Sequence, residues 1–192
     1  AAAFLVFQTA KFFVGFITQA AKVQKLVGEI GTLLQETTIG NLDELSQQIR
    51  AVAVEGGQDF EAAFKAAYNA ISAGVPAQQL IKFLTLANKT AIGGVTDMNT
   101  AVDLLTTVVN AWGVSFEEAE EFADALFTTV KIGKTTITEL AASIGFAAPQ
   151  AAAVGMSIQE LGSAIAVMTA NGLRSKIAMT RLNAMFRFIL KP

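Results

Sequence analysis

Residues 94–115 have the sequence GVTDMNTAVDLLTTVVNAWGVS, and this stretch determines the expected fold class. Its apolar residues recur three and four positions apart: Met98, Ala101, Val102, Leu105, Val108, Val109 and Trp112. This spacing places them on one face of an α-helix, with polar residues such as Asp103 on the opposite edge. The stretch therefore predicts an amphipathic helix from Asp97 to Trp112.

Both ends of this stretch carry one three-residue pattern: a glycine, an apolar residue and a residue suited to begin a helix. The pattern occurs as Gly74-Val75-Pro76, Gly94-Val95-Thr96, Gly113-Val114-Ser115 and Gly155-Met156-Ser157. Glycine adopts the left-handed conformation that follows many helix ends without a Cβ penalty. Serine and threonine accept from the free amides of the next helix, and proline at a first position loses no amide that would be used. With the Asn171-Gly172 helix end, these patterns predict structural joints at Gly74, Gly94, Gly113, Ser115, Gly155, Ser157 and Gly172.

The same signals predict short helices on both sides of the opening stretch. We expect helices over residues 42–55 with Asn41 as N-cap, from Phe60 to Gly74, from Pro76 towards Gly93-Gly94, from Phe116 through Val130, in two pieces between Thr136 and Gly155, from Ser157 to Asn171, and from about Arg174 onward. Three of them begin with a capping-box pair: Ser115 with Glu118, Thr136 with Glu139, and Ser157 with Glu160. No stretch alternates as a strand would, so the sequence predicts an all-α, multi-helix array of short helices.

Residues 1–35 predict a longer helix with a wide apolar face. A membrane-spanning helix needs about 20 predominantly apolar residues, and Gln8, Thr9 and Lys11 interrupt the candidate stretch. We therefore favour an interfacial or protein-packed helix over a spanning one. No basic residue precedes the apolar run, which argues against a secretory signal. We expect two units, a long amphipathic or hydrophobic helix at residues 1–38 and a helical core domain at residues 39–192.

Composition argues against several function classes. The chain has no cysteine and no histidine, which excludes internal disulfides, His-dependent triads and the common zinc sites. Its net charge is −2 and no Lys/Arg cluster is interleaved with aromatics, so we do not expect specific contact with DNA. Charged residues make up 16% of the chain, below the roughly 25% that is usual, and partners are expected to cover part of the surface. Because the chain begins at Ala1 and stops within a helical pattern, we expect a portion of a longer polypeptide.

Two groups of charged residues have a functional and a plainer interpretation. Glu117, Glu121 and Asp124 are candidate catalytic carboxylates, but they lie in the first turns of one helix, where the helix dipole favours acids. We therefore expect no catalytic, cofactor-binding or metal-binding residue. The final helix carries basic residues and no acid, as do helices that bind anionic lipid. The plainer interpretation, which we favour, is that these charges are solvated or paired with a neighbouring subunit.

Several segments carry a resemblance when taken in order. They are Phe60-Glu61-Ala62, Ile71-Ser72-Ala73-Gly74, residues 97–103, 122–126, 137–145, 153–161 and 170–182. This ordered series resembles the core domain of phage tail tape measure proteins, in the minor tail protein family, over roughly residues 42–190. Met179 departs from the glycine that the family shows between Ala178 and Thr180.

The resemblance implies a non-enzymatic structural protein of the virion without a cofactor, a segment of the protein that sets tail length during assembly and is released ahead of the DNA at infection. The implied partners are further copies in a small symmetric oligomer, the tail tube, and distal tail or baseplate hub proteins, with the host membrane as a partner during ejection. Short jointed helices do not build the extended rod that a ruler needs, so we expect a compact module near the tail tip or hub rather than the measuring stretch. Its expected location in the virion is the tail lumen or the tail tip. The alternative is a membrane-active helical module that forms or gates a channel for DNA ejection.

Overall fold

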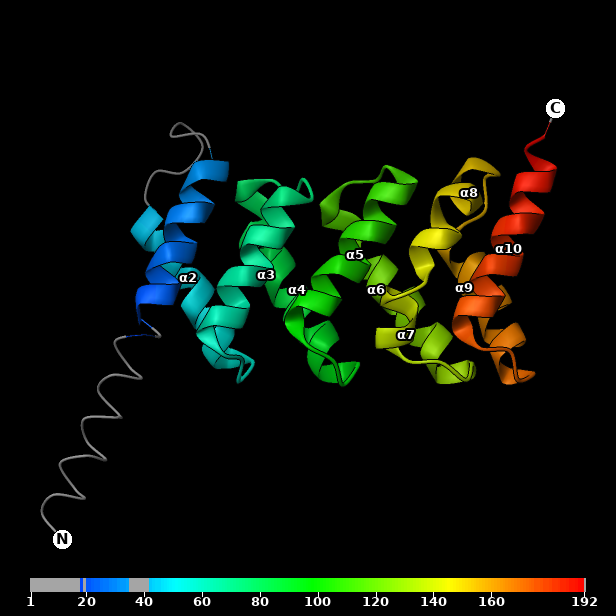
Figure 1. Ribbon diagram of the computed structural model, residues 1–192, viewed down its shortest axis with the longest axis horizontal. Helices are drawn as coiled ribbons and strands as arrows, with labels where there is room; N and C mark the ends of the chain where they lie inside the picture. Colours follow the sequence, from blue (N-terminus) through cyan, green and yellow to red (C-terminus); the bar gives the residue numbers. More distant parts are fainter. Residues whose placement is uncertain (1–17, 19, 35–41, 192) are drawn as a thin grey trace, which may run out of the picture.

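The structure is a computed structural model that describes residues 18, 20–34 and 42–191, and this part of the chain is an array of helices (Figure 1). A first helix covers residues 20–33. It is followed by α2 (Leu42–Glu55), α3 (Phe60–Ser72), η1 (Ala77–Gln79), α4 (Leu80–Gly93), α5 (Met98–Trp112), η2 (Phe116–Glu118), α6 (Ala119–Ile132), α7 (Ile137–Ala141), η3 (Ile144–Phe146), α8 (Ala148–Ala153), α9 (Ile158–Ala170) and α10 (Ser175–Ile189), where η marks a 3₁₀ turn. These residues contain no strand, which confirms the all-α class and the multi-helix array.

The helices stand side by side along the longest axis of the molecule, from α2 near one end to α10 at the other (Figure 1). The central helix α5 contacts α3 and α4 on one side, and α6, α7 and α8 on the other. Towards the C-terminal end, α9 packs against α6, and α10 packs against α8 and α9. The array therefore has a buried centre and two ends, and α10 lies at one of these ends.

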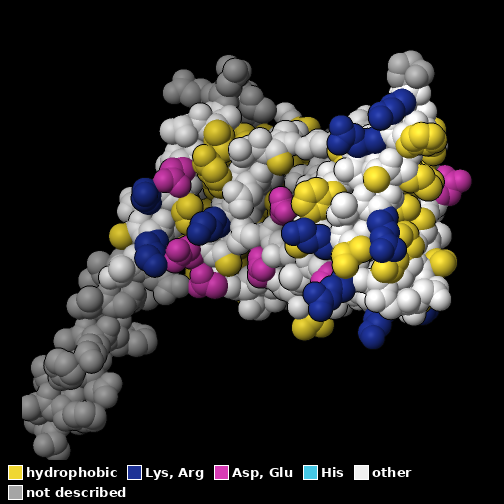
Figure 2. Space-filling view, turned by 45° about the vertical axis from the view of Figure 1, so that its right-hand side comes forward, with side chains coloured by type: hydrophobic (Ala, Val, Ile, Leu, Met, Phe, Trp, Pro, Cys, Tyr) yellow, Lys and Arg dark blue, Asp and Glu magenta, His cyan; other side chains and the backbone are white. Residues whose placement is uncertain are grey.

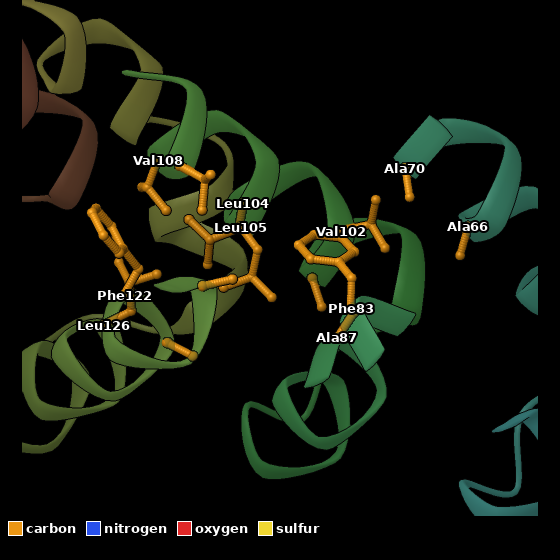
Figure 3. Close-up of a cluster of buried hydrophobic side chains, with 14 of the residues drawn as sticks. Ala66, Ala70, Phe83, Ala87, Val102, Leu104, Leu105, Val108, Phe122 and Leu126 are labelled. Atoms are coloured by element: carbon orange, nitrogen blue, oxygen red, sulfur yellow. The ribbon is translucent and has the colours of Figure 1, made fainter. Parts of the chain in front are cut away.

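Burial of α5 on more than one face explains why it is so apolar. Figure 3 shows Leu105 and Val108 directed towards Phe122 and Leu126 of α6, while Val102 lies beside α4. Leu104, which the predicted stripe omitted, is also fully buried, because neighbours surround α5. Each such leucine contributes about 1.5–3 kcal/mol relative to an exposed one.

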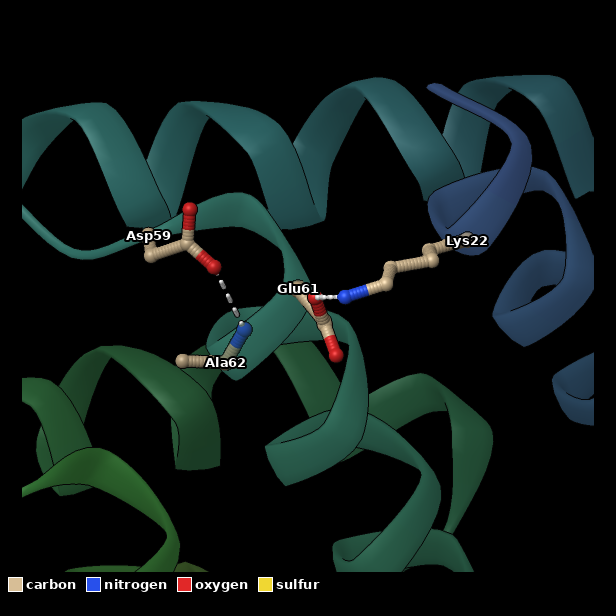
Figure 4. Close-up of polar contacts among 4 residues, drawn as sticks. All are labelled: Lys22, Asp59, Glu61 and Ala62. Carbon is tan, nitrogen blue, oxygen red and sulfur yellow. Dashed lines mark hydrogen bonds and ion pairs between the residues drawn. The ribbon is translucent and has the colours of Figure 1, made fainter. Parts of the chain in front are cut away.

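The first helix joins the same core through Val23 and Ile30, both of which are buried. The Lys22 ammonium lies 3.1 Å from the Glu61 carboxylate, and this ion pair connects the first helix to α3 (Figure 4). The predicted helical residues 1–17 and the Asn41 N-cap lie outside the described residues. Within the described residues, none of the helices combines the length and the apolar character that crossing a membrane would require.

Two helices differ in detail from their predictions. The helix expected from Pro76 begins with the 3₁₀ turn η1, a common tightening of a helix N-terminus, before α4 starts at Leu80. In α10, the helical spacing of Ala178, Leu182, Met185, Phe186 and Ile189 predicts one packed face, but Met185 and Ile189 are 46% and 59% exposed. Met179 is buried there instead, because α10 ends the array and has neighbours on one side only.

Candidate functional site

Four of the predicted joints end their helices with a left-handed glycine. The φ angles of Gly74, Gly113, Gly155 and Gly172 are 97°, 64°, 78° and 92°. At each joint the glycine amide donates to the carbonyl three residues back, and the following amide donates to the carbonyl five residues back. A Cβ atom at any of the four would meet nothing within 4 Å, so glycine is required there for its conformation and not for space.

The joint at residues 94–96 is built differently, and the expectation of a left-handed Gly94 is wrong. Gly94 has a φ of −89°, and Val95 takes the left-handed position with a φ of 51°. Helix α4 ends at Gly93 with Gly94 as its C-cap residue, so the amides of Val95 and Thr96 make the two bonds that close the helix. Gly94 is needed for space, because a Cβ atom there would lie 2.5 Å from Cγ1 of Ile137.

Asp97, and not Thr96, is the N-cap residue of α5, the helix that follows this joint. Its carboxylate accepts from the Thr100 hydroxyl at 2.6 Å and from the Thr100 amide at 2.9 Å. These hydrogen bonds, the hydroxyl's first, lower the pKa of Asp97 below its ordinary value. The left-handed residue is thus Val95 instead of Gly94, and the N-cap of α5 is Asp97 instead of Thr96. Both positions lie one residue later than the three-residue pattern predicts.

Ser115 and Ser157 form the capping boxes that the sequence predicts. Each serine hydroxyl accepts from a first-turn amide, and each serine amide donates to a glutamate, Glu118 at 3.2 Å and Glu160 at 2.8 Å. The hydrogen bonds from the amide and hydroxyl of Ser157 lower the pKa of Glu160. These two pairs fix where η2 and α9 begin.

The third predicted box forms only by half. The Thr136 hydroxyl accepts from the Glu139 amide at 3.1 Å, but the Glu139 carboxylate does not return to Thr136. It accepts instead from the hydroxyls of Ser175 at 2.8 Å and Thr135 at 3.2 Å. Ser175 is buried at the start of α10, whose N-cap residue, Arg174, provides no side-chain cap. Glu139 thus supplies from α7 the negative charge that the N-terminus of α10 lacks.

The C-terminal turn of α5 holds two other joints in place. The Asn110 side chain donates to the Ala73 carbonyl at 2.9 Å, at the end of α3. The Trp112 indole donates to the Met156 carbonyl at 2.8 Å. Its ring packs edge-on against the Phe122 ring, with the ring centroids 5.7 Å apart. The sequence pattern places Trp112 on the apolar stripe but gives no sign of the hydrogen bonds that Asn110 and Trp112 donate. Three joints are therefore linked at one end of α5.

Hydrogen bonds also connect the joints that lie on the side of the N-terminal end of α5. The Thr138 hydroxyl at the start of α7 donates to the Thr96 hydroxyl at 3.0 Å, and the Lys134 amide donates to the Thr169 hydroxyl at 3.1 Å. These contacts join residues 35 and 42 positions apart along the chain. The joints are thus cross-connected, which fixes the angles between successive helices.

The candidate carboxylates are exposed and fall into two places. Glu117 accepts from Gln79 and borders one shallow pocket, whereas Glu121 and Asp124 border another, where Glu121 accepts from Gln159. In residues 18, 20–34 and 42–191, no group of three or more Asp or Glu side chains could hold a metal ion. Glu117 thus borders a different pocket from the other two acids.

Comparisons with known proteins identify the family. Residues 44–192 match the family described as phage-related minor tail protein. A relative, the probable tape measure protein of Clostridium phage phiCD119, is 26% identical over 169 residues, which cover 86% of this chain and 18% of the relative. The chain therefore spans less than a fifth of that relative's length, and no solved structure matches it significantly. These matches confirm the resemblance in the sequence: the chain belongs to the family of phage-related minor tail proteins.

Proposed function

We propose that this chain is a folded segment of a tape measure protein, which sets tail length during assembly and is released ahead of the DNA at infection. The observation that carries the proposal is the family match over residues 44–192, almost the whole helical array. Family membership supports a structural role in a phage tail and a place in the tail of the virion. The name of the Clostridium phage relative supports the narrower assignment to a tape measure protein.

Within the tail, we place the segment near the tip or baseplate hub and not along the measuring stretch in the lumen. The longest helices of the described residues, α5 and α10, have 15 residues and therefore span about 22 Å each. If residues 42–191 formed one continuous helix, they would give a rod of about 225 Å. Because the array folds back at every joint, it contributes little length for its mass, which supports a compact module.

The proposed partners follow from this position. They are other copies of the chain in a small symmetric oligomer, the tail tube, and the distal tail or hub proteins, with the host membrane as a transient partner during ejection. Contact with DNA is non-specific, and the segment is not an enzyme. We keep the division near residue 39 as part of the proposal, with the preceding helix as a separate unit that contributes Val23 and Ile30 to the core.

A deletion experiment in the phage tests this proposal. Removing residues 42–191 from the parent gene is expected to give tails that fail to start or end correctly, since a terminal module is lost. An equal deletion in a long, uninterrupted helical stretch of the parent protein is the control and should shorten tails by about 225 Å. Electron microscopy of the tails measures both. If removal of residues 42–191 gave functional tails that are about 225 Å shorter, this segment would be part of the ruler.

A further inference from the structure

The outward side of α10 is both apolar and basic. Its exposed apolar side chains include Ile177, Met185 and Phe188, which are 43%, 46% and 77% exposed. Exposed basic side chains surround them: Arg174, Lys176, Arg181, Arg187 and Lys191. We call these eight residues the α10 surface. In Figure 2, hydrophobic and basic side chains lie next to each other over this end of the molecule.

The spacing on α10 indicates a second packing face. The buried face of the helix carries Ser175, Ala178, Met179, Leu182 and Phe186. Ile177, Arg181, Ala184 and Phe188 follow one another at intervals of four, three and four, which places them on the opposite face. A helix face that meets only water is normally polar. The apolar residues on this outer face therefore indicate that it contacts another surface.

The chain itself carries a surface of complementary charge. Five acidic residues lie at the start of the α6 region, all exposed: Glu117, Glu118, Glu120, Glu121 and Asp124. We call these five residues the α6 surface. No basic residue occurs between residues 115 and 130, and no acidic residue occurs beyond residue 160. Lys82 and Lys89 of α4 line the same pocket as Glu117 and Glu120, but no ion pair joins them within the described residues. Among the described residues, no ion pair involves either surface, although Glu117, Glu118 and Glu121 accept hydrogen bonds within the chain. Neither set of charges is therefore neutralised by an ion pair of its own.

We propose that the α10 surface of one copy docks on the α6 surface of a second copy. Charge decides between the possible contacts, because pairing two α10 helices would bring like charges together, whereas α10 against α6 brings opposite charges together. Since each copy offers both surfaces, the contact either forms twice in a dimer or repeats around a ring. The inference rests on the proposed oligomer and names the two surfaces that form it.

Charge reversal with rescue tests the contact on the 192-residue chain. Arg181→Glu with Arg187→Glu changes only the α10 surface, and Glu120→Lys with Glu121→Lys changes only the α6 surface. Each double variant should associate about tenfold or more weakly in sedimentation velocity. An equimolar mixture of the two should regain association, because each reversed surface then meets an opposite charge. Arg50→Glu with Lys65→Glu, which changes two exposed basic residues on α2 and α3, is the matched control and should leave association unchanged.

The apolar part of the contact has its own pair of variants. Phe188→Ser should weaken association, whereas Val54→Ser removes a similarly exposed apolar side chain from α2 and should not. Circular dichroism checks that every variant is folded.

Three results would overturn the inference. They are a chain that remains monomeric at high concentration, an oligomer that none of the charge reversals weakens, and a mixture that does not regain association. Vesicles of phosphatidylglycerol and phosphatidylcholine provide the competing occupant. A monomeric chain that binds them through Arg181 and Arg187 would assign the surface to lipid. None of these results depends on tail length, so the deletion experiment remains a separate test of the proposed function.

Discussion

At the scale of single residues, Val95 is the strained position of this fold. A β-branched residue in the left-handed region costs roughly 1–2 kcal/mol, and Val95 recovers little of that by packing, because it is 92% exposed. Packing restricts both preceding glycines, Gly94 more severely than Gly93. A Cβ atom at Gly93 would lie 3.1 Å from Phe127, and one at Gly94 would lie 2.5 Å from Ile137. The close packing of α4 thus occupies both glycines and leaves the left-handed position to valine.

The substitution Val95→Gly is therefore expected to stabilise the protein. Relief of the left-handed conformation raises the free energy of unfolding by about 1–2 kcal/mol. The greater conformational freedom of glycine in the unfolded chain lowers it by about 0.5–1 kcal/mol. We expect a net rise of about 0.5–1 kcal/mol in the free energy of unfolding, measured by urea denaturation. The matched control is Gly113→Val, which places a valine in the same conformation and should destabilise. A Val95→Gly protein no more stable than the original would show that Val95 is not strained.

At the scale of elements, α10 depends on a residue of α7. The N-terminus of α10 lacks a cap of its own, and the Glu139 carboxylate accepts from the Ser175 hydroxyl beside it. Local signals in the sequence predict where α10 begins to within about a residue. They do not predict this contact, since Glu139 and Ser175 are 36 residues apart and Glu139 also matches a local capping box. The structure uses the carboxylate for the distant helix and leaves the local box half formed.

Glu139→Ala is expected to loosen α10 before the rest of the array. The change removes a charged acceptor from the buried Ser175 hydroxyl and a favourable charge from the helix N-terminus, at a cost of about 1–3 kcal/mol. Hydrogen exchange should increase first in residues 175–189. Glu55→Ala is the control, because its exposed carboxylate accepts no hydrogen bond in the structure, and it should change stability by less than about 0.5 kcal/mol. Equal exchange in the two variants would show that Glu139 does not support α10.

At the scale of the whole molecule, the order of the helices could be predicted from the sequence, but which helices pack against one another could not. Caps such as Ser157 with Glu160 and left-handed glycines such as Gly155 act within one turn, so their residue types alone indicate the helix ends. Which helix lies at the centre depends on contacts between distant segments. The bond from Trp112 to Met156 spans 44 residues and leaves no local pattern. For the same reason the exposure of the outer face of α10 is visible only in the assembled array.

The central place of α5 predicts that the array unfolds as one unit. In a stack where each helix touches only its neighbours, the ends open independently of each other. Here α5 contacts α3 and α4 as well as α6, α7 and α8, so loss of packing within it should weaken both sides. Leu105→Ala is expected to cost about 2–5 kcal/mol and to increase hydrogen exchange in α3 and α8 alike. The control is Leu182→Ala in terminal α10, which should increase exchange mainly within α10. If Leu105→Ala exposed α3 while α8 stayed protected, the array would consist of two independent units that meet at α5.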